Sequence, residues 1–225
     1  GLDRVCLDEL LARASNTRYA FSASPAGDAG QAQPYVETLA QWPAGLVPLP
    51  AGEGEVALAA VGDVMLGRAV EPRALVYGPT YPLAALIPLL SEADITTGNL
   101  EGTLAFAGMP LQKSFTFRAH PEVVLGLQAA GFNLLTLANN HAADFGAAGL
   151  AETIAVLEAA GIASIGAGPQ AYAPALLEMK GIKIAILART YAIGQQDEVA
   201  WAEEEEIRTA VAAARAQADV VVLHL

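Results

Sequence analysis

Short apolar runs alternate with segments of helical periodicity from Glu55 to the end of the chain. Runs of β-branched and other apolar residues predict strands, whereas apolar residues spaced three and four apart predict helices. The expected strands are residues 56–61, 94–97, 115–117, 132–137, 162–165, 176–179, 183–187 and 219–225. The expected helices are residues 83–90, 121–130, 147–160 and 203–218. This alternation of strands and helices is typical of an α/β layered domain.

Three local signals support these boundaries. Pro121 stands at the start of one expected helix, where proline is favoured because its fixed backbone angle suits the first turn. Gly161 follows the helix 147–160, as expected for a residue that ends a helix. The residues Lys180-Gly181-Ile182 separate two apolar runs, which predicts a β-hairpin.

The pattern is different before Glu55. Residues 3–14 have apolar positions at helical spacing, and residues 22–54 are rich in Pro, Gly, Ala and Gln. We therefore divide the chain into residues 1–54, a flanking helix and linker or the end of a preceding domain, and residues 55–225, the α/β domain. The first residue is Gly1 and the last is Leu225, at the end of an apolar run. We expect a piece of a longer protein whose domain continues beyond Leu225.

Composition narrows the classes of function. The chain is 54% hydrophobic and 16% charged, so it can bury a substantial core. Its formal net charge of −12 argues against a nucleic-acid partner, which would require clustered Lys and Arg. An acidic protein can still act on anions if a bound metal ion supplies local positive charge. Cys6 is the only cysteine, which excludes an intrachain disulfide and a thiolate metal cluster.

The most informative segment is residues 134–146, where an apolar strand stops in two amides, a histidine and a carboxylate. Asn139, Asn140 and His141 follow the strand directly, and Asp144 lies one helical turn after His141. Ligands of open α/β sheets bind beyond the carboxyl ends of strands. Asn139 and Asn140 are also typical turn residues, and Asp144 is a typical helix cap. The histidine between them favours a site for a divalent metal or a phosphate ester, with Asp144 orienting the His141 ring.

Other strand ends carry similar side chains. Asp63 follows a strand and Gly62, although an aspartate there can also cap the next helix. Asn99 and Glu101 are two residues apart and point to the same side of an extended backbone, but they also fit an ordinary polar turn. His224 ends the last apolar run at a position that fits the same crevice. Arg68 is placed to contact an anionic substrate, although most exposed arginines have no such role.

The order of these motifs resembles the CapA family, poly-gamma-glutamate capsule-synthesis proteins with a calcineurin-like metallophosphatase fold. The resemblance covers residues 56–225. The matching segments are Gly62-Asp63-Val64-Met65, Gly98-Asn99-Leu100-Glu101, residues 115–121, residues 137–146 and Gly166-Ala167-Gly168.

The resemblance implies a metallophosphatase-like four-layer αββα sandwich, incomplete at its C-terminus, with one or two divalent metal ions. The implied metal ligands are Asp63, Glu101, Asn140 and His224. His141, positioned by Asp144, would donate a proton to the leaving group or contact the substrate anion, and Arg68 and Asn99 would bind substrate. Metallophosphatases carry an Asp-x-His motif after the first strand, but Met65 takes the place of that histidine.

Two functions follow from the resemblance. The first is a metal-dependent hydrolase domain in capsule biosynthesis, with an anionic polymer or a phosphoester as substrate. The alternative is a non-catalytic module that handles the polymer or binds subunits of a membrane capsule synthase, which Met65 favours. Either function implies a location at the cell envelope, with the targeting segment outside this sequence.

Overall fold

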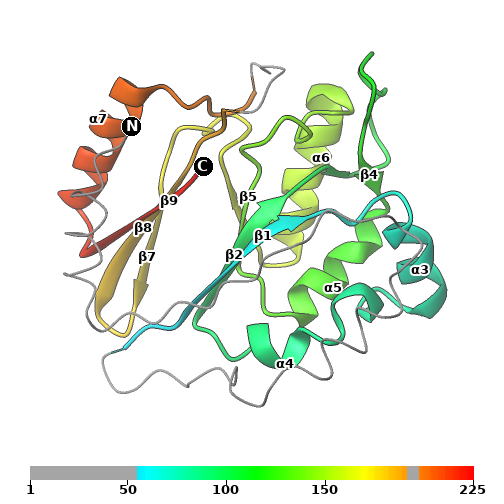
Figure 1. The fold of residues 1–225 in the computed structure, drawn as a ribbon, viewed down its shortest axis with the longest axis horizontal. Coiled ribbons are helices and arrows are strands. Elements are labelled where there is room, and N and C mark those ends of the chain that lie inside the picture. Colours follow the sequence, from blue (N-terminus) through cyan, green and yellow to red (C-terminus); the bar gives the residue numbers. More distant parts are fainter. Residues whose placement is uncertain (1–54, 192–197) are drawn as a thin grey trace.

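The structure, a computed structural model, describes residues 55–191 and 198–225 (Figure 1). The helix expected in residues 3–14 and the linker in residues 22–54 lie outside the described residues. The other expected elements can be compared with the fold directly.

The first sheet has four parallel strands in the order β1-β2-β5-β6. These strands are β1 (Leu58–Val64), β2 (Ile95–Leu100), β5 (Leu134–Thr136) and β6 (Ala163–Ile165). All four strands were expected from the sequence, but β1 and β2 extend three residues further toward their carboxyl ends. Because the strands are parallel, the segments that follow them meet at one edge of the sheet.

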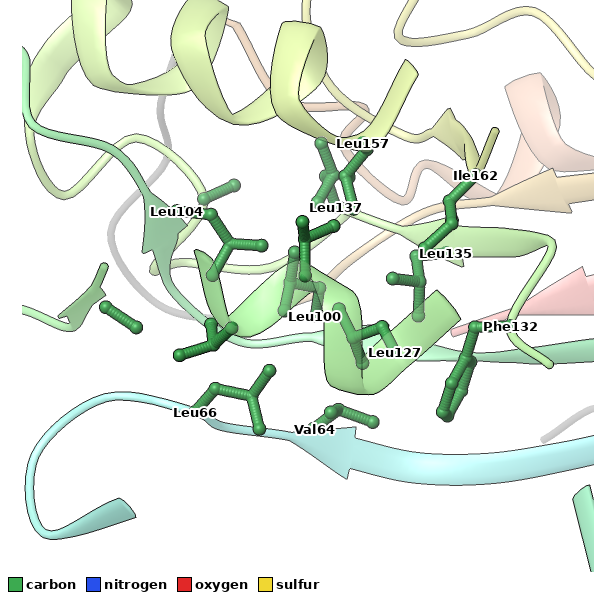
Figure 2. Close-up of a cluster of buried hydrophobic side chains, with 14 of the residues drawn as sticks. Val64, Leu66, Leu100, Leu104, Leu127, Phe132, Leu135, Leu137, Leu157 and Ile162 are labelled. Carbon is green, nitrogen blue, oxygen red and sulfur yellow. The ribbon is translucent and has the colours of Figure 1, made fainter. Parts of the chain in front are cut away.

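Helices cover one face of this sheet (Figure 1). They are α3 (Val70–Tyr77), α4 (Ile87–Leu90), α5 (Val124–Ala129) and α6 (Gly146–Ala159), with short 3₁₀ turns η1 (Tyr81–Leu83) and η2 (Pro121–Val123). Figure 2 shows the core beneath them, where Leu127 and Leu157 pack with Leu100, Leu135 and Leu137 of the sheet side. All five leucines are at most 1% exposed, so this layer is closed to water.

The second sheet contains β7 (Ala175–Met179), β8 (Ile182–Ala188) and β9 (Val220–His224). β7 and β8 form the expected antiparallel hairpin, and β9 is parallel to β8. Lys180 and Gly181 in the turn both have positive φ angles, as a tight two-residue hairpin turn requires. Helix α7 (Glu204–Arg215) lies on the outer face of this sheet (Figure 1).

The alternation of side chains along β8 shows how the layers stack. Ile184 and Ile186 pack against Ile95 and Leu134 of the first sheet, whereas Ala185 and Leu187 pack on the α7 side. Successive residues of a strand point to opposite faces, so both faces of β8 are covered. The architecture is therefore helices, sheet, sheet and helix, which confirms the predicted four-layer αββα sandwich.

Two elements differ from the expectation. The short edge strand is β4 (Arg118–Ala119), paired in parallel with β3 (Thr103–Leu104), and not residues 115–117. The predicted helix 83–90 is divided into η1 and α4. Helix α3 was not expected because its amphipathic signal is weak: it has Pro72 in its first turn and buries only Ala74. None of the described helices combines the length and apolarity needed to cross a lipid bilayer.

Candidate functional site

Asp63 and Asn99 meet where β1 and β2 end. The two residues are register partners in the parallel pair, which places their side chains next to each other. The Asn99 Nδ2 group donates a 2.8 Å hydrogen bond to Asp63 Oδ1. The register shifts between Ala60 and Asp63, so the end of β1 departs from the regular ladder at the point where its functional side chain appears. Such irregularities often re-aim a side chain at a site.

Asn139 connects this pair to the histidine segment after β5. Its Nδ2 group donates to Asn99 Oδ1 at 2.8 Å and to the Leu100 carbonyl at 2.9 Å. Its Oδ1 atom accepts a 2.9 Å hydrogen bond from the His141 backbone N–H. Asn139 was interpreted from the sequence as a turn residue. It makes the local turn and also joins the ends of β2 and β5 through one side chain.

His141 and Asp144 form the buried centre of the segment. His141 Nδ1 lies 2.8 Å from Asp144 Oδ2, and the Asp144 side chain is 0% exposed. The Phe117 N–H also donates to Asp144 Oδ2, at 2.5 Å, and Lys113 Nζ forms an ion pair with Asp144 Oδ1. The His141 ring stacks on the Phe117 ring with centroids 4.1 Å apart. A hydrogen bond and a ring face therefore both fix the orientation of the imidazole.

Glu101 faces the other nitrogen of the same ring. Its Oε1 atom lies 3.8 Å from His141 Nε2. Burial, followed by the negative charge of Asp63, raises the pKa of Glu101 above its usual value, although the neighbouring His141 opposes this shift. The carboxylates Asp63 and Glu101 thus repel each other at the edge of the sheet, and a bound cation would relieve that repulsion.

The other predicted residues lie further from this centre. The Asn140 carbonyl accepts a 2.7 Å hydrogen bond from Lys113 Nζ. His224 Nε2 lies 3.3 Å from Thr97 Oγ1, two residues before Asn99 on β2, so the side chain of His224 reaches the first sheet from the second. Burial lowers the pKa of His224 and favours its neutral form. Arg68 is exposed, with its guanidinium carbon 5.7 Å from the centre of the Phe117 ring.

The sequence did not indicate that Lys113 and Phe117 contact Asp144, although residues 115–121 are among the segments that resemble the CapA family. Both lie in the irregular connection between β3 and β4. The Lys113 ammonium and the Phe117 N–H each contact the Asp144 carboxylate. A lysine and a phenylalanine in a segment without periodicity carry no local signal of this contact. The tertiary fold brings them next to the pair formed by His141 and Asp144, which we call the dyad.

The donor types at this edge fit a divalent cation. Carboxylate and amide oxygens suit hard metal ions, and the imidazole of His224 suits a transition metal. Over residues 55–191 and 198–225, however, no group of three or more His, Cys, Asp or Glu side chains is arranged to hold a metal ion. The described residues therefore include side chains of the types that bind metal ions, but not a complete set of ligands around one point. The metal ligands Asp63, Glu101, Asn140 and His224 stay predictions.

Several known proteins are similar in sequence to parts of this chain. Over 141 residues, or 58% of the chain, it is 36% identical to the uncharacterized protein y4uA of Sinorhizobium fredii. It is 35% identical over 112 residues, 48% of the chain, to the capsule biosynthesis protein CapA of Bacillus anthracis. It is also 42% identical over 79 residues, 35% of the chain, to a probable polyglutamine synthesis accessory protein of Mycobacterium tuberculosis.

The matched segments cover 29%, 27% and 21% of these three relatives, so the chain corresponds to a minor part of each. The family model described as "Bacterial capsule synthesis protein PGA_cap" matches residues 57–225. This range contains both sheets, the helices that cover them and every candidate residue of the site. The chain therefore belongs to the bacterial capsule synthesis protein PGA_cap family, which confirms the resemblance to CapA proteins.

Proposed function

We propose that this domain takes part in the biosynthesis of a capsule-type polymer at the cell envelope, as a metal-assisted hydrolase. The names of relatives, such as the capsule biosynthesis protein CapA of Bacillus anthracis, support the biosynthetic role. The observation that carries the hydrolase activity is the buried His141–Asp144 pair beside the carboxylates of Asp63 and Glu101. An oriented imidazole next to two carboxylates can serve both proton transfer and metal binding.

The acid–base part of the mechanism rests on which imidazole nitrogen is available. With Nδ1–H donating to the Asp144 carboxylate, the proton exchanged with substrate is the one on Nε2. Stacking on Phe117 keeps the ring from rotating away from that position. His141 then donates a proton to the leaving group as the bond to it breaks, or contacts the substrate anion. A positioned acid of this kind contributes about 10²- to 10⁴-fold to a rate.

The metal part rests on the residues at the ends of the strands. Asp63, Glu101, Asn140 and His224 would hold one or two divalent ions, and Asn99 would bind substrate next to Asp63 and keep that carboxylate oriented. A metal bound there supplies an activated water and stabilises developing negative charge. The proposed substrate is an anionic polymer or a phosphoester.

The second candidate function is a non-catalytic module that handles the polymer or binds subunits of a membrane capsule synthase. Met65 favours it, because a thioether replaces an imidazole two residues after Asp63. A thioether is a poor ligand for the hard ions that carboxylates prefer. The fold would then present the same crevice to a polymer without cleaving it.

Metal analysis and hydrolysis assays on the full-length protein that carries this domain test the proposal. The assays use a phosphodiester and a polyglutamate as substrates. We expect Asp63→Ala to lower the bound metal and His141→Ala to lower turnover by about a hundredfold or more. His120→Ala is the matched control, because the His120 ring caps the turn η2 through its bond to the Glu122 N–H and packs edge-to-face on Phe106. If His141→Ala and Asp63→Ala change neither metal content nor turnover, the hydrolase proposal is wrong and the non-catalytic module replaces it.

A further inference from the structure

Among the residues that the structure describes, Arg68 has aromatic neighbours and forms no ion pair with a carboxylate. Its guanidinium carbon lies 5.9 Å from the centre of the Phe115 ring and 5.7 Å from that of Phe117. Within the described parts of the chain, the ion pairs between arginine or lysine and a carboxylate involve other residues: Lys113, Lys180, Arg189 and Arg208. Over residues 55–191 and 198–225, Arg68 is thus a positive charge without a carboxylate partner, in a protein of net charge −12.

The backbone at Arg68 is held in an unusual conformation. Its φ angle is +53°, and among the described non-glycine residues only Lys180 shares a positive value. Lys180 lies in a hairpin turn that requires it, but Arg68 follows the end of β1 and precedes α3. The preceding Gly67 packs directly on β4, where an added Cβ would lie 2.7 Å from the Arg118 carbonyl oxygen. Such strained residues persist where the surrounding structure fixes them, and they are concentrated at functional sites.

The position of Arg68 relates it to the proposed active site. The Phe117 ring contacts both the Arg68 guanidinium and the His141 imidazole. Arg68 and His141 therefore share Phe117 as a neighbour, which places the guanidinium near the dyad of His141 and Asp144. Phe115, the second ring, is 62% exposed and forms an apolar surface beside the cation.

We propose that Arg68 and Phe115 form a subsite for a second anionic group of the substrate, a carboxylate or a phosphate, next to the group that reacts at His141. The inference rests on the proposed function, because it assumes that His141 faces the reacting bond. A guanidinium held by the faces of aromatic rings keeps its N–H edges available for a carboxylate or phosphate. A substrate that fills both positions carries repeated negative charges, as an anionic polymer does.

Binding of two polyanions to the 225-residue chain tests this subsite without any turnover. The probes are a linear hexaglutamate, which carries carboxylates, and tripolyphosphate, which carries phosphates, each titrated by calorimetry. We expect the chain to bind at least one probe, and the preferred probe identifies the anion. Arg68→Ala should weaken that binding about tenfold or more, as expected for the loss of charge-assisted hydrogen bonds. Arg68→Lys should restore only part of it, because lysine keeps the charge without the planar fork.

Arg73→Ala is the matched control, because Arg73 is an exposed arginine on the neighbouring helix α3 and removes the same charge. It should leave the affinity within about twofold of the unmodified chain, since surface charges interact weakly in water. The subsite is disproved if neither probe binds, or if Arg68→Ala and Arg73→Ala have equal effects. A loss of turnover in His141→Ala together with normal probe binding in Arg68→Ala would sink the subsite and leave the proposed function standing. The reverse result would leave the subsite and remove the hydrolase.

Discussion

Replacing Asp144 by asparagine tests the buried centre of the site. The Asp144 carboxylate is 0% exposed and receives three partners: the His141 imidazole, the Phe117 N–H and the Lys113 ammonium. An asparagine oxygen can still accept from His141 and Phe117, but its NH₂ group would then face Lys113. The ion pair between Lys113 and residue 144 is therefore lost, and the asparagine NH₂ group, a hydrogen-bond donor, faces the Lys113 ammonium.

The magnitude follows from the burial of the two partners. Removing one member of a fully buried ion pair typically costs about 3 to 5 kcal/mol. The Lys113 side chain is 27% exposed and also donates to the Asn140 carbonyl, so it can turn toward water and keep one bond. We therefore expect Asp144→Asn to lower the free energy of unfolding by about 2 to 3 kcal/mol, below that fully buried range.

Urea unfolding of a double-mutant cycle measures this effect. Lys113→Met alone should also destabilise the chain, because it leaves the buried carboxylate with two donors. The double variant Asp144→Asn with Lys113→Met should be more stable than the sum of the single losses predicts, by about 1 kcal/mol or more, since contacting residues are not additive. If the two losses add within about 0.3 to 0.5 kcal/mol, as they do for independent sites, Lys113 does not stabilise Asp144 and the reasoning is refuted.

Two further predictions concern ion pairs away from the site. Burial tends to raise the pKa of Asp94, but hydrogen bonds from Lys180 and a backbone N–H lower it below the usual 3.8. A carboxylate whose pKa is lowered by folding stabilises the fold above pH 3.8, and this stabilisation is lost as the pH falls through the pKa of the folded state. Lys180→Met should therefore weaken the fall in the free energy of unfolding at acid pH, as measured by urea unfolding. Glu206→Ala should lower the free energy of unfolding by about 2 kcal/mol in thermal unfolding, because it leaves the Arg189 guanidinium, 0% exposed, without its bidentate carboxylate. Glu205 is exposed, so Glu205→Ala should lower it by less than about 0.5 kcal/mol. Equal losses for the two glutamate variants, or an unchanged fall at acid pH, would contradict these assignments.

The layered fold could be predicted because both β-sheets leave a simple pattern. Residues 184–188 form one continuous apolar run, which is typical of a strand covered on both faces. The pattern could not show which layer each face contacts: Ile186 packs toward the first sheet and Leu187 toward α7, and the two look alike in sequence. Helix α3 escaped prediction for the opposite reason, since Val76 and Tyr77 are largely exposed and blur its amphipathic face.

The strand-end residues of the site could be predicted because parallel strands place their carboxyl ends together. Asp63 and Asn99 are 36 residues apart in the chain, yet their side chains are hydrogen-bonded as register partners. Phe117 and Asp144 are 27 residues apart, with β4, α5 and β5 between them. Phe117 itself lies in the irregular connection between β3 and β4, so no periodicity indicates its contact with Asp144. Sequence reasoning therefore located the strand-end half of the site and missed the contacts that the β3–β4 connection adds.

The two halves of the site depend on different residues. The orientation of His141 depends on Asp144 and Phe117, which contact the imidazole and each other, whereas Asp63 and Asn99 bond to each other at the strand ends. Asn139 links the two halves through its bonds to Asn99 and to the His141 backbone, and the Glu101 carboxylate interacts with both the charge of Asp63 and His141 Nε2. Loss of a metal ligand after β1 therefore leaves the imidazole held as before, because the acid–base half has its own supports. Met65 is evidence about the metal half alone, and the catalytic competence of His141 must be measured independently of it.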